Sequence, residues 1–211
     1  MDDSKSALDQ YCEAHTTAPP DLLYRLERET YLKTLAPQMA SGPLQGQLLT
    51  MLTRMLQPQL VLEIGTFTGY ATLCIARGMP PTGRIHTIEV NDEIAYISQK
   101  YFNQSPQAEQ ITAHLGDAQT IVPSIEGQFD MVFIDAGKKD YAAHFDLTVD
   151  RVRPGGILIA DNVLWSGKVM NENPDRDTQV LLDFNKKVQA DPRVENVLLP
   201  IRDGLLVMQR M

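Results

Sequence analysis

The stretch LVLEIGTFTGYATLCIARGM, residues 60–79, decides the fold. It begins with an apolar run typical of a buried strand, passes through Gly65 and Gly69, and continues into a segment with the character of a helix. A strand, a glycine turn and a helix form the first part of a βαβ unit. We therefore expect an α/β fold built on a parallel sheet.

The alternation of strand and helix continues downstream. Four more short runs are rich in β-branched and apolar residues, and each is separated from the next by a segment that indicates a helix or a long loop. These runs are RIHTIEV (84–90), ITAHLGD (111–117), FDMVFID (129–135) and GGILIAD (155–161). Asn91 is placed to cap the helix that follows it, with Asp92 and Glu93 in the first turn. The pattern predicts βαβ crossovers with helices on both faces of the sheet.

The C-terminal end departs from this alternation. After a predicted helix over residues 177–190, two apolar runs flank Arg202-Asp203-Gly204, and Asp-Gly between such runs is typical of a hairpin turn. A parallel sheet that ends in an antiparallel hairpin is not the plain dinucleotide-binding arrangement. We predict a seven-stranded, Rossmann-like sheet of the class I S-adenosylmethionine-dependent methyltransferase type.

Residues 1–57 are expected to form helices that cover the site, before a Rossmann-like core over residues 58–211. One helix begins at PPDLL (19–23), where prolines suit a helix start. A second begins at Ser41-Gly42-Pro43 and ends at Pro58. It carries an apolar face formed by Leu44, Leu48, Leu52, Met55 and Leu56. No repeat or linker divides the chain, so we expect a single domain over residues 1–211.

Composition excludes several functional classes. The chain is 43% hydrophobic and 22% charged, as in ordinary globular proteins. No apolar run approaches the ~20 residues that span a bilayer, and the N-terminus lacks the features of a signal peptide. We expect a cytoplasmic protein with no membrane partner, in which Cys12 and Cys74 are reduced thiols. The net charge of −8 argues against a nucleic-acid partner.

The glycine turn indicates the kind of ligand. Ligands of open α/β sheets bind at the carboxyl ends of the strands. The spacing from Gly65 to Gly69 lacks one glycine of the G-x-G-x-x-G pyrophosphate motif, and Glu63 would repel a pyrophosphate. A carboxylate here suits a ligand with positive charge, such as the ammonium and sulfonium of S-adenosylmethionine (SAM). Glu89 ends the next strand, where an acidic residue can bind both ribose hydroxyls, and Asp117-Ala118 ends the third near the expected adenine.

A second polar group follows the fourth and fifth strands. Adjacent parallel strands would bring Asp135, Asp161 and Asn162 together at the carboxyl edge of the sheet. Two carboxylates and an amide oxygen form a hard ligand set that suits Mg²⁺, Mn²⁺ or Ca²⁺. Mg²⁺ is the cation that we expect first. Three protein ligands leave coordination positions for a chelating substrate.

Several motifs in order resemble one known family, the cation-dependent O-methyltransferases that include caffeoyl-coenzyme A and animal catechol O-methyltransferases. The resemblance extends from about residue 30 to the C-terminus and is strongest to the plant-type and bacterial branch. Its motifs are LQGQLLTML, LEIGTFTGY, HTIEV, FIDAGKKDY, IADNVLWSG, DFNKKVQADPRVE and DGLLVMQR.

The resemblance implies roles for individual residues. Asp135, Asp161 and Asn162 would bind the cation, and Lys138 would be the catalytic lysine, with Asp135 beside it. The residues expected to bind SAM are Ser41, Glu63, Gly65, Thr66, Tyr70, Ala71, Glu89, Asp117, Ala118 and Asp135. The residues expected to contact the substrate are Lys138, Trp165, Ser166 and Asn185, whereas Phe184 suits either the pocket or the core.

Two departures from the family pattern stand out. Ala71 occupies a position that is usually serine, which removes one hydroxyl contact to the cofactor. Gly137 and Asp140 replace an acidic residue and an asparagine of the plant enzymes, with Lys139 between them. We expect these differences to affect substrate preference.

The resulting hypothesis is a SAM- and divalent-cation-dependent O-methyltransferase that acts on a vicinal diphenol of the catechol, caffeoyl or flavonoid type. Lys138 is expected to accept the hydroxyl proton in preference to Lys139. One alternative is a transfer RNA hydroxyuridine O-methyltransferase, which the net charge disfavours. Another is an NAD-dependent oxidoreductase, which the incomplete glycine motif and the hairpin disfavour. The resemblance also implies a homodimer, formed through the N-terminal region.

Overall fold

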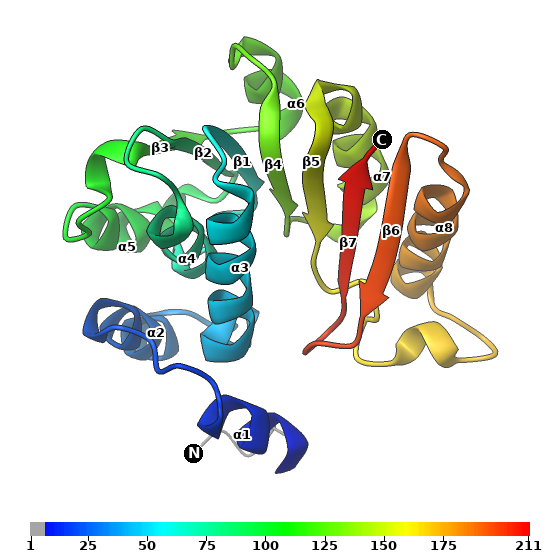
Figure 1. Cartoon of the computed structure of the whole chain (residues 1–211). Coiled ribbons are helices and arrows are strands. Elements are labelled where there is room, and N and C mark those ends of the chain that lie inside the picture. The colour runs from blue at the N-terminus through cyan, green and yellow to red at the C-terminus, as the bar shows by residue number, and fades with distance from the viewer. Residues whose placement is uncertain (1–6) are drawn as a thin grey trace.

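A computed structural model describes residues 7–211 and contains one seven-stranded sheet in the order β3-β2-β1-β4-β5-β7-β6 (Figure 1). The first five strands pair in parallel, and β7 is antiparallel to both β5 and β6. The strands are β1 (Leu60–Ile64), β2 (Arg84–Glu89), β3 (Ile111–Leu115), β4 (Phe129–Ile134), β5 (Val152–Ala160), β6 (Val194–Leu199) and β7 (Leu205–Arg210). The predicted fold class, including the C-terminal hairpin, is confirmed.

Helices connect the parallel strands and precede the sheet. The α-helices are α1 (Ala7–Ala14), α2 (Asp21–Lys33), α3 (Gly42–Leu56), α4 (Tyr70–Gly78), α5 (Asp92–Phe102), α6 (Ala118–Ile121), α7 (Tyr141–Thr148) and α8 (Arg176–Ala190). The 3₁₀ turns are η1 (Pro37–Met39), η2 (Ala108–Gln110), η3 (Val122–Ser124), η4 (Lys138–Asp140), η5 (Val149–Arg151) and η6 (Lys168–Met170). Asn91 caps α5 as predicted, because its side chain accepts a hydrogen bond from Glu93 N.

One strand boundary differs from the prediction. β5 begins at Val152, whereas the sequence pattern placed its start at residue 155. Pro154 and Gly155 resemble a turn, but they lie inside the strand where its register with β4 shifts between Phe129 and Met131. Such an irregularity accommodates both residue types within a strand.

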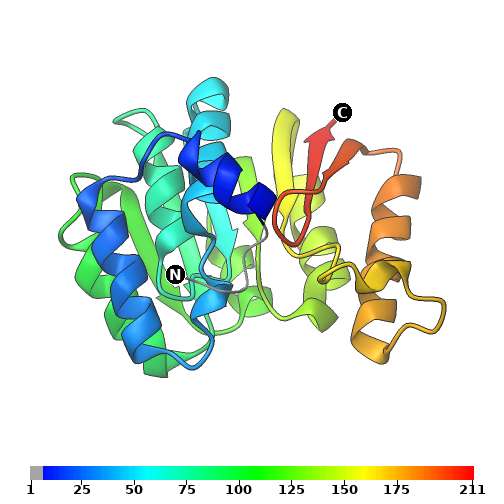
Figure 2. The same cartoon turned by 90° about the horizontal axis from the view of Figure 1, so that it is seen from below.

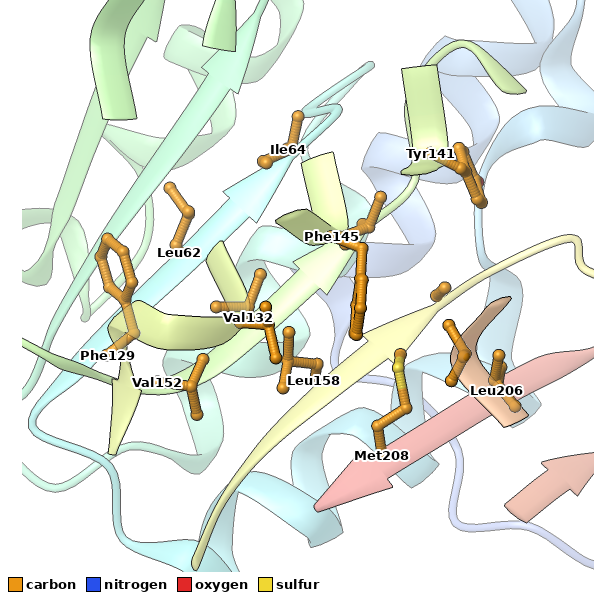
Figure 3. Packing of buried hydrophobic residues seen from close by; sticks show 14 of the residues in the cluster. Leu62, Ile64, Phe129, Val132, Tyr141, Phe145, Val152, Leu158, Leu206 and Met208 are labelled. Carbon is orange, nitrogen blue, oxygen red and sulfur yellow. The ribbon is translucent and has the colours of Figure 1, made fainter. Parts of the chain in front are cut away.

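The sheet is buried on both faces. One face packs against α6, α7 and α8 in a cluster that includes Val132, Tyr141 and Phe145 (Figure 3). The other packs against α2, α3, α4 and α5 around Met131 and Phe133. Successive residues of β4 therefore point into opposite clusters, as the alternation of side chains along a strand requires. Burial of about 25 cal/mol per Å² of apolar surface makes these two layers the main source of stability.

Small side chains allow α3 to approach α4 closely. A Cβ atom at Gly46 would lie 2.7 Å from Cys74 Sγ, and one at Gly78 would lie 2.5 Å from Thr50 O. The predicted apolar stripe of α3 lies at the margin of this contact, since Leu48 and Leu52 are only partly buried and Met55 is 70% exposed. The helix was predicted correctly, but small and polar residues form most of its buried face.

Helices α1 and α2 lie beyond the end of the sheet at which β4 finishes, whereas α3 runs alongside the sheet (Figure 1). In the view from below, α1 lies in front of the rest of the molecule (Figure 2). α2 is fixed to α5 because Tyr101 Oη donates to Arg25 O at 2.9 Å and Lys100 pairs with Glu29. Among residues 7–211, no helix combines the length and apolar character that a membrane span requires. Cys12 and Cys74 are both free thiols.

Candidate active site

The ends of β1, β4 and β5 bring the predicted polar residues together. Ile134 of β4 is opposite Ala160 of β5, so Asp135 and Asp161 follow at adjacent strand ends. Backbone hydrogen bonds continue the ladder one residue further, from Asp135 N to Ile64 O at 2.8 Å and from Asp161 N to Ile134 O at 3.0 Å. The position of both carboxylates is therefore fixed by the register of the sheet.

Lys138 lies among these groups. Its Nζ donates to Asn162 Oδ1 at 2.5 Å and to Tyr141 Oη at 2.8 Å, and it is 3.5 Å from Asp135 Oδ1. The Trp165 ring centroid is 5.8 Å from the same nitrogen. The side chain of Lys138 is only 15% exposed, whereas Lys139 is exposed. Only Lys138 of the two therefore faces the predicted ligand set.

The two aspartates form a buried pair of like charges. Burial and the negative charge of Asp161 together raise the pKa of Asp135 to about 7, although the nearby Lys138 opposes them. Burial also raises the pKa of Asp161, although hydrogen bonds from Gln45 and from Asn162 N favour its charged form. A bound cation would relieve this repulsion, because a positive charge favours the ionised form of each carboxyl group.

Gln45 belongs to this group but was not predicted from the sequence. Its Nε2 donates to Asp161 Oδ2 at 2.6 Å, and its Oε1 is buried without a hydrogen-bond partner. Tyr141 begins α7, and its Oη donates to Asp161 O at 2.9 Å. Gln45 lies on α3 and Tyr141 on α7, and both are distant from Asp161 in the sequence. No spacing rule therefore connects them with Asp161.

The residues present fit a divalent cation. Asp135, Asp161 and Asn162 offer hard oxygen atoms. The Gln45 side chain, which binds Asp161 through Nε2, offers a further buried acceptor, because its Oε1 has no hydrogen-bond partner. Within residues 7–211 there is no group of three or more His, Cys, Asp or Glu side chains arranged to hold a metal. The predicted set has only two carboxylates and completes its ligands with amide oxygen.

A small pocket lies next to the carboxylate pair. It collects six of the residues predicted to bind SAM, together with Met39, Ala40 and Phe67. The six are Ser41, Gly65, Thr66, Tyr70, Ala71 and Asp135. Gly65 has φ +106°, and a Cβ atom there would fall 1.9 Å from Asp135 O. Only glycine allows the turn after β1 to approach the end of β4 so closely.

Glu63 lies fully buried beneath this turn. Its carboxylate accepts hydrogen bonds from Thr72 Oγ1 and, at 2.5 Å, from Thr87 Oγ1, whereas its Oε1 has no partner. Burial is the main influence and raises the pKa of Glu63 to about 8, against the two threonine hydrogen bonds that lower it. Glu63 does not itself line the pocket, and without a cationic partner its ionised form is costly.

This buried acid predicts a pH-dependent stability. The ordinary pKa of 4.5 applies when the chain is unfolded, so folding favours protonated Glu63 between that value and about 8. The stabilising contribution is fully present below the unfolded pKa and is lost as the pH rises through the folded one. We expect the free energy of unfolding, measured by urea denaturation relative to Glu63→Gln, to fall by roughly 2–5 kcal/mol between about pH 5 and about pH 9. Parallel curves for the two proteins would contradict this.

The other predicted cofactor residues lie at the ends of β2 and β3. Glu89 Oε2 accepts from Phe67 N at 2.7 Å, and its Oε1 accepts from Asn91 N at 2.9 Å. Glu89 therefore faces the loop that forms the pocket. Asp117 caps α6 by accepting from Gln119 N at 2.8 Å, and Ala118 is buried. Neither Asp117 nor Ala118 lines the pocket that contains Ser41.

The predicted substrate residues separate into two places. Trp165 lies beside Lys138, and Ser166 is exposed with its backbone N bound to the Asp203 carboxylate. Asn185 donates to Val163 O at 3.0 Å and lines a different groove between α8 and β6, with a volume of about 620 Å³. Phe184 is 1% exposed and packs edge-on against Tyr141, so it belongs to the core.

Comparison with known proteins now decides the family. The chain matches the O-methyltransferase family over residues 13–211. The protein belongs to this family. The match begins earlier than residue 30, where the resemblance by motif began. A catechol O-methyltransferase from Niastella koreensis is 34% identical over 168 residues, which cover 77% of this chain and 76% of that protein.

This O-methyltransferase is also similar to a plant relative in sequence and to two solved structures in fold. Caffeoyl-CoA O-methyltransferase 1 from Eucalyptus globulus is 31% identical over 186 residues, covering 82% of this chain and 75% of that one. The Bacillus cereus O-methyltransferase in complex with S-adenosylhomocysteine (SAH) is 28% identical, with a TM-score of 0.88 and 98% coverage of both chains. TomG from Streptomyces achromogenes, in complex with SAM, is 28% identical with a TM-score of 0.89, covering 98% of this chain and 96% of that one. The prediction of a methyltransferase fold and family is confirmed.

Proposed function

We propose that this O-methyltransferase transfers a methyl group from SAM to one hydroxyl of a vicinal diphenol, of the catechol, caffeoyl or flavonoid type, with the help of a divalent cation. The convergence of Asp135, Asp161 and Asn162 with Lys138 supports this proposal most strongly. This group lies directly beside the pocket that contains Gly65, because Asp135 belongs to both.

The pocket residues are assigned to SAM. Bound SAM supplies a methyl group on a sulfonium and leaves as SAH. Ser41, Gly65, Thr66, Tyr70 and Ala71 would surround its amino-acid portion, and the relatives in complex with SAM or SAH support this assignment. The remaining assignments are Glu63 to the ammonium, Glu89 to the ribose hydroxyls, and Asp117 and Ala118 to the adenine.

The carboxylate group is assigned to a cation, with Mg²⁺ as the first candidate and Mn²⁺ or Ca²⁺ as alternatives. Asp135, Asp161 and Asn162 would hold it through oxygen, while Gln45 keeps Asp161 in position. A bound divalent cation makes a chelated catechol hydroxyl easier to deprotonate and orients it.

Lys138 is assigned as the proton acceptor. Its Nζ already contacts Asn162 and Asp135, so it lies within reach of any hydroxyl that those residues help to hold. A base in this position accepts the proton at Nζ while the phenol oxygen takes the methyl group. The Trp165 ring, 5.8 Å from Lys138 Nζ, would provide an apolar surface for the substrate. Ser166 and Asn185 remain weaker candidates for substrate contact.

A single assay tests this function. Methyl transfer from SAM would be measured over vicinal diphenols, monophenols and transfer RNA, with Mg²⁺, Mn²⁺, Ca²⁺ or a chelator in parallel. We expect turnover of the diphenols only, and only with a cation. Methylation of transfer RNA would establish the alternative acceptor, and binding of NAD without SAH would reject the proposed methyl transfer.

We further propose that the enzyme acts in the cytoplasm as a homodimer, with no nucleic-acid or membrane partner.

A further inference from the structure

The turn between β6 and β7 reaches across the molecule to the N-terminal segment. Arg202 Nη1 donates to Ala40 O at 2.6 Å, and its Nη2 donates to Gln38 O at 3.0 Å. Both carbonyls belong to the η1 turn and its end, immediately before Ser41. A guanidinium is a planar fork, so it fixes the two acceptors relative to one another as a lysine could not.

The segment that Arg202 holds forms one wall of the proposed cofactor pocket. Met39, Ala40 and Ser41 line that pocket opposite the Gly65 turn. Ala40 and Ser41 are buried, whereas Met39 is 56% exposed, so packing fixes the end of this wall better than its beginning. Gly42 follows with φ +70°, and a Cβ atom there would lie 3.2 Å from Arg202 Nη1. The guanidinium therefore fits directly over the start of α3.

The same turn also binds the segment after β5, a second wall that carries Asn162 and Trp165 beside Lys138 and does not line the cofactor pocket. Leu164 N donates to Asp203 O at 2.9 Å, Val163 N donates to Gly204 O at 3.2 Å, and Ser166 N donates to the Asp203 carboxylate. This wall contains left-handed backbone at non-glycine residues, namely Asn162 (φ 57°), Trp165 (φ 48°) and Ser166 (φ 52°). Such backbone persists only when surrounding contacts enforce it. Adjacent turn residues thus restrain both sides of the site.

We propose that Arg202 is a positioning residue for cofactor binding, which holds residues 38–41 against the pocket and couples that wall to the segment that carries Asn162 and Trp165. The inference rests on the proposed placement of SAM, but not on the identity of the acceptor or on the cation. No motif predicted it, because Arg202 looked like an ordinary hairpin residue beside Asp203-Gly204.

The test compares Arg202→Gln, Arg202→Lys and the control Arg84→Gln. Arg84 also donates to turn carbonyls, to Gly83 O at 3.0 Å, but it lies at the start of β2. SAH affinity would be measured by calorimetry in chelator, and amide hydrogen exchange would be followed at Met39 and Ala40, which donate within the η1 turn. We expect SAH to bind roughly tenfold or more weakly to Arg202→Gln, with faster exchange at these amides.

The remaining outcomes separate the possible explanations. Arg202→Lys retains the charge but presents its donors from a single nitrogen, so an intermediate SAH affinity is expected. Arg84→Gln should match the wild type. With saturating SAM, kcat of Arg202→Gln should stay within about threefold of the wild type while the KM for SAM rises. Unchanged SAH affinity in a folded Arg202→Gln variant would overturn this inference. If the wild type itself fails to bind SAH, the proposed function is rejected first.

Discussion

Replacement of Asp161 by alanine is expected to reduce methyl transfer to a catechol by about 10³-fold or more, because a metal-assisted reaction loses one of its two carboxylate ligands. The same change removes the partner of Gln45, whose Nε2 donates to Asp161 Oδ2 at 2.6 Å in the wild type. Folding should survive, since removal of one member of a buried pair of like charges relieves repulsion with Asp135. Initial rates with Mg²⁺ and thermal unfolding followed by circular dichroism would measure both effects.

Asp146→Ala is the matched control for Asp161→Ala. Asp146 pairs with Lys187 at 2.8 Å on the surface, and its side chain is 51% exposed. We expect this variant to retain activity and to lose at most about 1 kcal/mol of stability. Excess chelator should inactivate the wild type as Asp161→Ala does. Full turnover of a catechol in chelator would refute the role of the cation, whatever the rate of the variant.

Replacement of Lys138 by alanine is expected to lower kcat by roughly 10²–10⁴-fold, the usual contribution of a general base. Lys138 Nζ contacts Asn162 and Tyr141, and of the residues that line the proposed SAM pocket it contacts Asp135. SAH affinity should therefore change by less than about threefold, which separates the proton acceptor from a cofactor ligand. Stopped assays at saturating SAM and calorimetric titration with SAH would provide the two numbers.

Lys139→Ala is the control for Lys138→Ala, because it removes the same side chain from the neighbouring position. Lys139 is exposed, and we expect kcat to remain within about twofold of the wild type, as for other surface substitutions. An equal loss of kcat in both variants would remove the distinction between the two lysines. An equal loss of kcat and of SAH affinity in Lys138→Ala would instead make this residue part of the cofactor site.

Most of the fold could be predicted because strands buried on both faces give uninterrupted apolar runs. β4 shows this well, since Met131 and Phe133 enter one cluster while Val132 and Ile134 enter the other. The adjacency of Asp135 and Asp161 followed from the same rule, because parallel neighbours end at the same edge of the sheet. The start of β5 was missed, since an irregular register hides Pro154 and Gly155 within a strand.

The contacts made by helices and turns could not be predicted in the same way. The apolar stripe of α3 predicted a different buried face from the one that carries Gln45. The small residues of α3 pack closely against α4, and Gln45 faces Asp161. Arg202 contacts Ala40, which lies 162 positions earlier in the chain. Local sequence patterns do not predict contacts over such a separation. Asn185 resembled a pocket residue, but the orientation of α8 places it in another groove.

The position of Asp135 and Asp161 at the ends of paired strands has a consequence for engineering. Backbone hydrogen bonds of the sheet fix Asp135 and Asp161, whereas Gly137 and Lys139 are exposed in the turn that follows Asp135. Exchange of Gly137, Lys139 and Asp140 with the residues of a related enzyme, with Lys138 retained, is therefore expected to alter which acceptor is chosen without a change to Asp135, Lys138 or Asp161. The choice of acceptor and the rate of transfer are thus expected to respond to different positions of the chain.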